Sequence, residues 1–386
     1  MPPFLSKYLN IYRFFYGTSF KATDVPLPRR PEEDWALMHE ESPKNNPVFS
    51  HAEMIRHFNF TSTFSRQSSF PLTSQYLESL EFLTTASYLV TTGEKNRLQG
   101  EEEEGLAPVA YVQSGCDGPS LRDEWVTEFM KHIRVDSYGA CLNNKQLPPD
   151  MRGSEKFESD KFYKYLARYK FVISFENAIC DDYVTEKLWR TLATGSVPIY
   201  LGAPNIETLL PNKKSAILVK DFQSPHEVAQ YVHQMNNDDE LYNSFLQHKA
   251  LYSQGTGSQV TNSELGDMVN TRQWGVSSQQ QRRQGNMVAH YQCHVCQKIA
   301  RNLKFSNRGF RPLPFSAGGE DYGCRAPVSP LTGEKQPAQS WWGQQWLRSK
   351  HEAFVMDKFA KQNIPIDKQQ FYEQTLELMQ SELKKR

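Results

Sequence analysis

Short apolar runs alternate with helical segments in the middle of the chain. Each apolar run has the length of one strand, and one segment between two runs places Val184, Leu188 and Leu192 four positions apart, as on one face of a helix. Strands that alternate with helices favour a parallel sheet covered by helices, so we predict an α/β fold of the doubly wound class. We expect strands at residues 169–175, 197–201 and 216–219, and helices at residues 183–194 and 225–235.

A run of four glutamates at residues 101–104 interrupts this pattern. Such a run neither buries itself nor forms a strand, so we expect a solvated loop and place a domain boundary there. The apolar pattern resumes directly after it, at residues 107–114, where we expect a strand. The predicted organisation is an N-terminal domain at residues 1–105, a second domain at 106–300 and a C-terminal extension at 301–386.

The C-terminal extension begins in a stretch rich in Gly, Pro and Ser, residues 302–340, for which we expect irregular structure. It ends at residues 367–385, where Phe371, Thr375 and Met379 are spaced by four positions. That spacing predicts an amphipathic terminal helix.

The charge balance narrows the possible partners. The 386 residues carry 44 Lys and Arg against 44 Asp and Glu, so the formal net charge is zero. Proteins that bind nucleic acids through phosphates carry an excess of positive charge that this chain lacks, so we expect no nucleic acid partner.

No stretch approaches the run of about 20 apolar residues that spans a bilayer, so we expect membrane attachment only through an anchor upstream of this chain. Six cysteines suit a secretory enzyme with two or three disulfides, or a cytosolic protein with free thiols.

Polar side chains gather where the strand at residues 169–175 ends. Glu176 and Asn177 follow this strand directly, and ligands of open α/β sheets bind beyond the carboxyl ends of strands. In the next expected helix, Tyr183, Glu186 and Lys187 have the spacing of one helix face. The first turn of a helix also attracts phosphate through unpaired N–H groups. These residues therefore predict a phosphate-binding site, although a helix with solvated surface charges is the simpler alternative.

The same region carries strings that identify a family. F-E-N, D-Y-V-T-E-K-L-W-R and G-S-V-P-I-Y-L-G follow one another within residues 175–202. Together they resemble the signature of the α1,3-fucosyltransferases, glycosyltransferase family 10. The strings H-E-E-S-P at 39–43 and T-S-T-F-S-R at 61–66 point to the divergent branch that contains the tenth and eleventh vertebrate members. Further strings match the family in order. These are H-E-E-S-P at 39–43, F-N-F-T at 58–61 followed by Arg66, Ser114 with Arg122, D-S-Y-G at 136–139 and C-H-V-C at 293–296.

The resemblance implies two facing Rossmann-like domains of the GT-B type, with a C-terminal helical extension here. It also implies a GDP-fucose donor and inversion at the anomeric carbon. Glu41 would be the catalytic base, with the adjacent Glu40 as the alternative, and Arg66 would lie on the acceptor side. Lys187 would contact phosphate and Glu186 would accept hydrogen bonds from ribose hydroxyls. The residues that match the donor side are Ser114, Arg122, Tyr138, Glu176, Asn177, Tyr183, Glu186 and Lys187.

No D-x-D string is present that could hold a metal on the diphosphate. We therefore expect no metal and no cofactor, and expect Lys187, Arg122 and the helix N-terminus to stabilise the departing diphosphate. No G-x-G-x-x-G string is present either, which disfavours a cytosolic dinucleotide enzyme.

The family's disulfide motif falls on Cys293 and Cys296, so we expect disulfides there. His290 and His294 also offer a zinc knuckle, but four ligands within seven residues would strain a tetrahedral site. Asn59 begins the one glycosylation sequon, within residues that also form a family motif.

This chain departs from the family after Arg66, where Gln67 to Ser69 replace its D-S-D string. The acceptor remains open between N-acetylglucosamine in a glycan, with an α1,3 linkage, and a serine or threonine of a folded secretory protein domain. The resemblance places the full-length enzyme in the Golgi or endoplasmic reticulum lumen as a type II membrane protein. The alternative function is a catalytically silent GDP-sugar-binding or chaperone-like protein of the secretory pathway.

Overall fold

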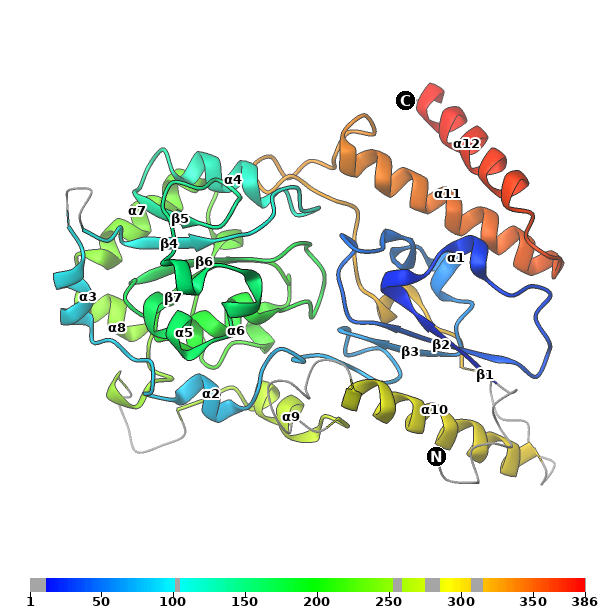
Figure 1. The fold of residues 1–386 in the computed structure, drawn as a ribbon, viewed down its shortest axis with the longest axis horizontal. Helices are drawn as coiled ribbons and strands as arrows, with labels where there is room; N and C mark the ends of the chain where they lie inside the picture. Colours follow the sequence, from blue (N-terminus) through cyan, green and yellow to red (C-terminus); the bar gives the residue numbers. More distant parts are fainter. Residues whose placement is uncertain (1–11, 101–104, 253–258, 275–284, 307–314, 386) are drawn as a thin grey trace.

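The structure is a computed structural model that describes residues 12–100, 105–252, 259–274, 285–306 and 315–385. Two parallel sheets form the centres of two α/β units that lie side by side, and two long C-terminal helices lie on the smaller unit (Figure 1). The predicted α/β fold, with two facing GT-B-like domains and a helical extension, is confirmed. Among the described residues, no helix combines the length and apolar character that a membrane crossing requires.

The smaller, three-stranded unit is built on alternating side chains of its central strand. Trp35 and Leu37 face one side of the sheet, and Ala36 and Met38 face the other. Its strands, all parallel and in the order β1-β2-β3, are β1 (Tyr12–Tyr16), β2 (Asp34–His39) and β3 (Phe60–Thr63). The first face packs against α1 (Ala52–Ile55) and α11 (Trp341–Gln362), and the second against α10 (Gly285–Ser306). The last helix, α12 (Lys368–Lys385), packs against α11.

The larger, five-stranded unit has helices on both faces of its sheet. Phe171, Ile173 and Phe175 face one layer of helices, and Val172 faces the other. Its parallel strands, in the order β5-β4-β6-β7-β8, are β4 (Val109–Val112), β5 (Val135–Tyr138), β6 (Phe171–Phe175), β7 (Val197–Leu201) and β8 (Ile217–Leu218). The first layer contains α4 (Arg122–Phe129), α7 (Pro225–Asn236) and α8 (Asp239–Ser244). The opposite face carries α2 (Leu80–Thr84), α5 (Asp160–Leu166), α6 (Glu186–Ala193) and α9 (Ser263–Thr271).

The domain boundary expected at residues 101–104 is wrong, and those residues lie outside the described ones. Leu83 of α2 packs with α6, and Lys95 of α3 (Thr92–Leu98) donates hydrogen bonds to the carbonyls of Tyr169 and Gly195 at 3.0 and 2.6 Å. These helices precede the acidic run and yet belong to the five-stranded unit. The chain returns to the three-stranded unit with α10, so the boundary predicted at residue 300 is also misplaced.

Most predicted elements of the five-stranded unit are confirmed, including β6, β7, β8 and α7, as is the terminal helix α12. The helix expected at residues 183–194 begins only at Glu186, because Thr185, at the N-cap position, still has extended backbone angles. Tyr183 therefore lies in the preceding loop and does not share a helix face with Glu186 and Lys187.

Four of the six cysteines form two disulfides, Cys116–Cys141 and Cys180–Cys324. Cys293 and Cys296 are free thiols on α10, so the disulfides expected at this pair are wrong. The other four cysteines are paired with one another, and Cβ atoms three residues apart on a helix lie about 5–6 Å from each other, too far for a disulfide.

Candidate active site

A cavity of about 660 Å³ lies between the two units, where strands of both sheets end. Glu41 follows β2 of the three-stranded unit, whereas Ser114 and Asn177 follow the adjacent strands β4 and β6 of the five-stranded unit. Glu186 and Lys187 reach the same cavity from the first turn of α6. The structure therefore brings together five of the residues that the sequence singles out, at the place where ligands of parallel sheets bind.

The N-terminus of α6 is held by a buried carboxylate. Glu176 accepts hydrogen bonds from the backbone N and the Oγ1 of Thr185, both at 2.7 Å. Lys187 Nζ donates to Thr185 Oγ1 at 2.7 Å and lies 3.4 Å from Glu176 Oε2. Burial raises the pKa of Glu176, and the Lys187 charge opposes that rise. Glu176 thus helps to orient Lys187, which lines the cavity, whereas Glu176 does not line it.

Glu186 is suited to remain ionised at the cavity wall. Burial acts to raise its pKa, but the charges of Lys187 and Arg190 outweigh burial, so the pKa of Glu186 is lowered. An ionised carboxylate accepts hydrogen bonds from hydroxyl groups, as the role predicted for Glu186 requires.

Glu41 has the surroundings of a general base. Burial, together with the neighbouring charge of Glu40, raises the pKa of Glu41. Tyr76 donates from its hydroxyl to Glu41 Oε1 at 3.3 Å, and Tyr322 donates to the Glu41 backbone carbonyl at 2.8 Å. A carboxylate with a raised pKa abstracts a proton more readily near neutral pH than an ordinary one, so the geometry fits the predicted role.

Glu40 lines the same cavity and remains the alternative base. Its Oε1 accepts a short hydrogen bond from Tyr16, and its buried Oε2 has no hydrogen-bond partner among the described residues. The Glu40 backbone carbonyl accepts from Gln75 Nε2 at 3.1 Å. The unpaired oxygen of Glu40 is thus buried, and the choice between Glu41 and Glu40 as the base stays a prediction.

Arg122 does not line the cavity, although a donor contact was predicted for it. Its side chain is fully buried, with Nη1 donating to the Phe175 carbonyl at 2.9 Å and Nη2 to the Gly115 carbonyl at 3.3 Å. These bonds fasten the loop after β4 to the end of β6. Arg122 therefore lies behind the cavity wall and does not make the direct contact with phosphate that the sequence predicted.

Tyr138 and Tyr183 are also buried, and neither is among the residues that line the cavity. The Tyr138 hydroxyl forms hydrogen bonds with Tyr165, at 3.0 Å, and with Tyr169, at 2.5 Å. The Tyr183 ring packs edge-on against Phe64, with ring centroids 4.9 Å apart. Tyr138 therefore stabilises the wall, whereas burial and the nearby charge of Glu41 raise the pKa of the Tyr183 hydroxyl.

Arg66, expected on the acceptor side, joins the two units. Its backbone N and Nε donate to the Asp182 carboxylate at 2.9 and 2.8 Å, and its Nη2 donates to Thr208 at 2.7 Å. A short ion pair with Glu264 of α9 completes the contacts. The Arg66 guanidinium is not among the groups that line the cavity.

The sequon at Asn59 is engaged within the fold. Its Oδ1 accepts from the Trp35 backbone N at 3.0 Å and from Arg29, and its Nδ2 donates to the Phe315 carbonyl at 3.3 Å. Thr61, the third residue of the sequon, is buried. A glycan on Nδ2 would disrupt the contact with Phe315, so the structure favours an internal role for this motif.

The sequence analysis did not identify Lys44 and Tyr76, which also line the cavity. Lys44 Nζ donates to the Cys116 carbonyl at 3.5 Å, and Lys44 forms no ion pair with the described residues. Burial, with the nearby Arg122 and Lys187 charges, lowers the pKa of Lys44. A half-buried cation among other cations is a natural site for an anion. The one sequence feature that could have identified Lys44 is its position three residues after Glu41.

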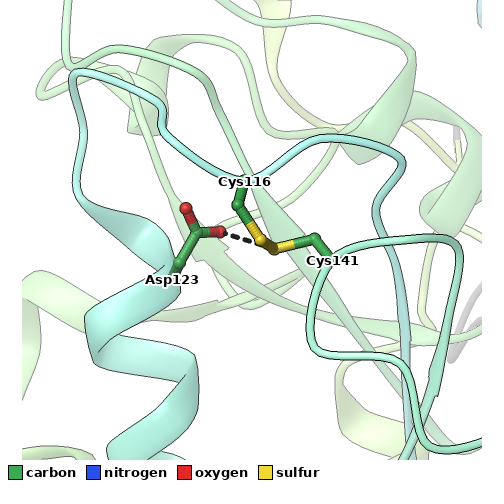
Figure 2. Close-up of side chains that lie close together, drawn as sticks. All are labelled: Cys116, Asp123 and Cys141. Carbon is green, nitrogen blue, oxygen red and sulfur yellow. Dashed lines mark hydrogen bonds between the residues drawn. A yellow bond between two sulfur atoms is a disulfide. The ribbon is translucent and has the colours of Figure 1, made fainter.

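One group of potential metal ligands occurs in the described part of the chain, formed by Cys116, Asp123 and Cys141 (Figure 2). Figure 2 shows the two sulfurs bonded to each other beside the Asp123 carboxylate. Sulfurs in a disulfide offer no thiolate, so this group does not fit a metal.

Comparisons with known proteins bear on the chemistry of this cavity. Residues 104–308 match the family model "Glycosyltransferase family 10 (fucosyltransferase) C-term". The chain is 41% identical over 373 residues to GDP-fucose protein O-fucosyltransferase 3 of Bos taurus, covering 95% of this chain and 75% of the relative. The protein of the same name from Homo sapiens is 42% identical over 363 residues, with 93% and 73% covered. A solved α1,3-fucosyltransferase with GDP is similar at a TM-score of 0.39 and 18% identity, over 55% of this chain and 65% of that one.

Proposed function

The chain belongs to glycosyltransferase family 10, the fucosyltransferases, and we propose that it transfers L-fucose from GDP-fucose to a serine or threonine hydroxyl of a folded protein. The family membership supports the donor and the reaction. The names of the bovine and human relatives, at 41% and 42% identity, support a protein acceptor.

One observation carries the proposal: Glu41 of the three-stranded unit and Lys187 of the five-stranded unit line the same cavity. Sugar transfer needs a base at the attacking hydroxyl and positive charge at the departing diphosphate. In our proposal, Glu41 takes the hydroxyl proton while the oxygen bonds to the anomeric carbon. The bond from that carbon to the GDP oxygen breaks on the opposite face, so the configuration inverts.

Cationic side chains would stabilise the leaving group. Lys187 lies at the N-terminus of α6, and Lys44 faces the same cavity from the other unit. Charge-assisted hydrogen bonds from such lysines suit phosphate oxygens, and Glu186 suits the ribose hydroxyls. We therefore propose that catalysis needs no metal ion and no cofactor.

The proposed setting is the secretory pathway, in the lumen of the Golgi or the endoplasmic reticulum. Disulfides persist in oxidising compartments, and the pairs Cys116–Cys141 and Cys180–Cys324 support such a setting. A disulfide in the loop between β4 and α4 also stiffens the wall of the proposed donor site.

The test is incubation of the purified chain with labelled GDP-fucose, a panel of folded secretory domains and a panel of N-acetylglucosamine-terminated glycans. We expect label on serine or threonine of a folded domain, with the initial rate unchanged after chelation with EDTA and dialysis. Transfer to glycans alone would overturn the protein acceptor. Binding of GDP without transfer to any acceptor would favour the silent-binder alternative, and recovery of a chelator-sensitive rate by manganese would overturn the metal-free mechanism.

A further inference from the structure

A second cavity, of about 640 Å³, lies beside the candidate active site. It is bordered by the loop that leads into α4 and by the first turn of α11. Three carboxylates and two indoles line it, those of Asp117, Asp123, Glu124, Trp341 and Trp342. The residues that line it include no lysine, arginine or histidine.

The two cavities share one wall. Ser114 and Gly115 line the active-site cavity, whereas Asp117 and Gly118, a few residues later, line the second. Cys116 lies between these pairs and is fixed by its disulfide to Cys141 (Figure 2). A ligand in the second cavity would therefore lie next to the reaction site, across a stiff loop.

The C-terminal extension completes this cavity. Trp342 is nearly buried and donates from Nε1 to the Asp117 carbonyl at 3.2 Å, which attaches α11 to the loop after β4. Trp341, its neighbour, is 65% exposed, the largest exposed fraction among the exposed large apolar side chains of the described residues. One tryptophan thus builds the cavity and the other leaves its ring open to a ligand.

The three carboxylates of the cavity also divide into one that shapes the loop and two that are exposed. Asp123 accepts a hydrogen bond from the Asp117 backbone N at 2.7 Å and so shapes the loop. The exposed carboxylates of Asp117 and Glu124 accept no hydrogen bond and form no ion pair within the described part of the chain. Two exposed negative charges beside an open indole are complementary to a cation, because carboxylates pair with a positive charge and an indole face attracts it.

We propose that this second cavity binds a lysine or arginine side chain of the protein acceptor, close in space to the hydroxyl that receives fucose. The proposal rests on the protein acceptor proposed above. A folded domain does not fit inside a cavity of 660 Å³, so an acceptor hydroxyl that reaches Glu41 must bring neighbouring residues onto the surrounding surface. The second cavity adjoins that surface and carries the opposite charge to a basic residue.

The test uses a trilysine peptide as the probe, titrated into the full chain and followed by calorimetry, with a neutral trialanine peptide and methyl β-glucoside alongside. The wild-type chain should bind trilysine, more weakly at higher salt, and neither of the other two. Trp341→Ala, and Asp117→Asn combined with Glu124→Gln, should each weaken trilysine binding about two- to fivefold, the effect of one lost exposed cation–π or ionic contact. Matched controls are Phe354→Ala, another exposed aromatic residue of α11, and Glu240→Gln, an exposed acid of α8.

GDP affinity should stay unchanged in all these variants, which shows that they fold. Trilysine binding of equal strength in wild type and in the cavity variants would overturn the proposal. Binding of methyl β-glucoside that Trp341→Ala abolishes, without trilysine binding, would assign the cavity to a sugar and overturn it as well. A wild-type chain that does not bind GDP would contradict the proposed function, whereas the trilysine result would still decide the chemistry of the second cavity.

Discussion

Arg66 of the three-stranded unit donates two hydrogen bonds to the carboxylate of Asp182 in the five-stranded unit, at 2.9 and 2.8 Å. Asp182 is almost fully buried and precedes α6, the helix that presents Lys187 to the cavity. This pair therefore joins the two units directly behind the proposed donor site.

Replacement of Arg66 by alanine should destabilise the chain by about 3 kcal/mol, because a buried carboxylate then loses its charged partner. Chemical denaturation measures the loss. Arg348→Ala is the control, since Arg348 forms an exposed pair with Glu352 within one helix and its removal should cost less than about 0.5 kcal/mol. Equal effects of the two substitutions would show that the link between the units contributes little.

The two cavity lysines should contribute separately to GDP binding. Calorimetry should show that Lys187→Ala weakens GDP binding by about 2 kcal/mol and Lys44→Ala by about 1 kcal/mol, as charge-assisted bonds to phosphate are lost. Lys44→Arg should retain most of the affinity because it keeps the positive charge. Lys131→Ala, which removes an exposed lysine outside the cavity, provides the control. Unchanged affinity in Lys44→Ala would remove Lys44 from the donor site.

The Tyr76 hydroxyl should set the acid limb of the pH profile. It donates to Glu41 and so favours the ionised carboxylate, which lowers the pKa of Glu41 against the larger raising effect of burial. Tyr76→Phe removes that bond, so the pKa of Glu41 should rise further and kcat/KM should begin to fall at a higher pH. The profile of kcat/KM against pH measures the shift. An acid limb that stays in place would show that Glu41 is not the group that titrates.

Buried histidines should make the chain less stable in acid. Burial lowers the pKa of His51 to about 4 from an ordinary value of 6.5. Between these two values the unfolded chain binds a proton that the folded chain does not, so stability falls as the pH drops from 6.5 towards 4. His51→Gln, which can still bond Ser349, should reduce this loss by about 2 kcal/mol, as measured by denaturation at pH 7 and pH 4.5. An identical loss in the variant would assign acid lability to other groups.

The sequence predicted the elements whose pattern is local. The strands β6 and β7 are continuous apolar runs between turns, and the residues that follow such strands are expected at the edge where ligands bind. Glu41 and Lys187 meet at the cavity as their family strings imply, although they lie 146 positions apart in the chain.

What the sequence could not show depends on tertiary packing. Arg122 matches its family motif, but it is buried because the first residue of α4 faces the protein interior, which the motif does not reveal. The helices α2 and α3 are short, and no periodicity tells which sheet they cover. Cys324 pairs with Cys180 across 144 residues, a contact that only the folded extension creates.

The central claim is that Glu41 acts on the acceptor hydroxyl and that GDP-fucose binding in the same cavity does not depend on Glu41. The most direct measurement combines donor affinity and turnover for Glu41→Gln, with Glu40→Gln as the matched variant. The account predicts that Glu41→Gln leaves GDP-fucose affinity near that of the wild type and lowers kcat by roughly 10² to 10⁴, the contribution of a general base. Near wild-type turnover in Glu41→Gln, whether or not Glu40→Gln is inactive, would contradict it.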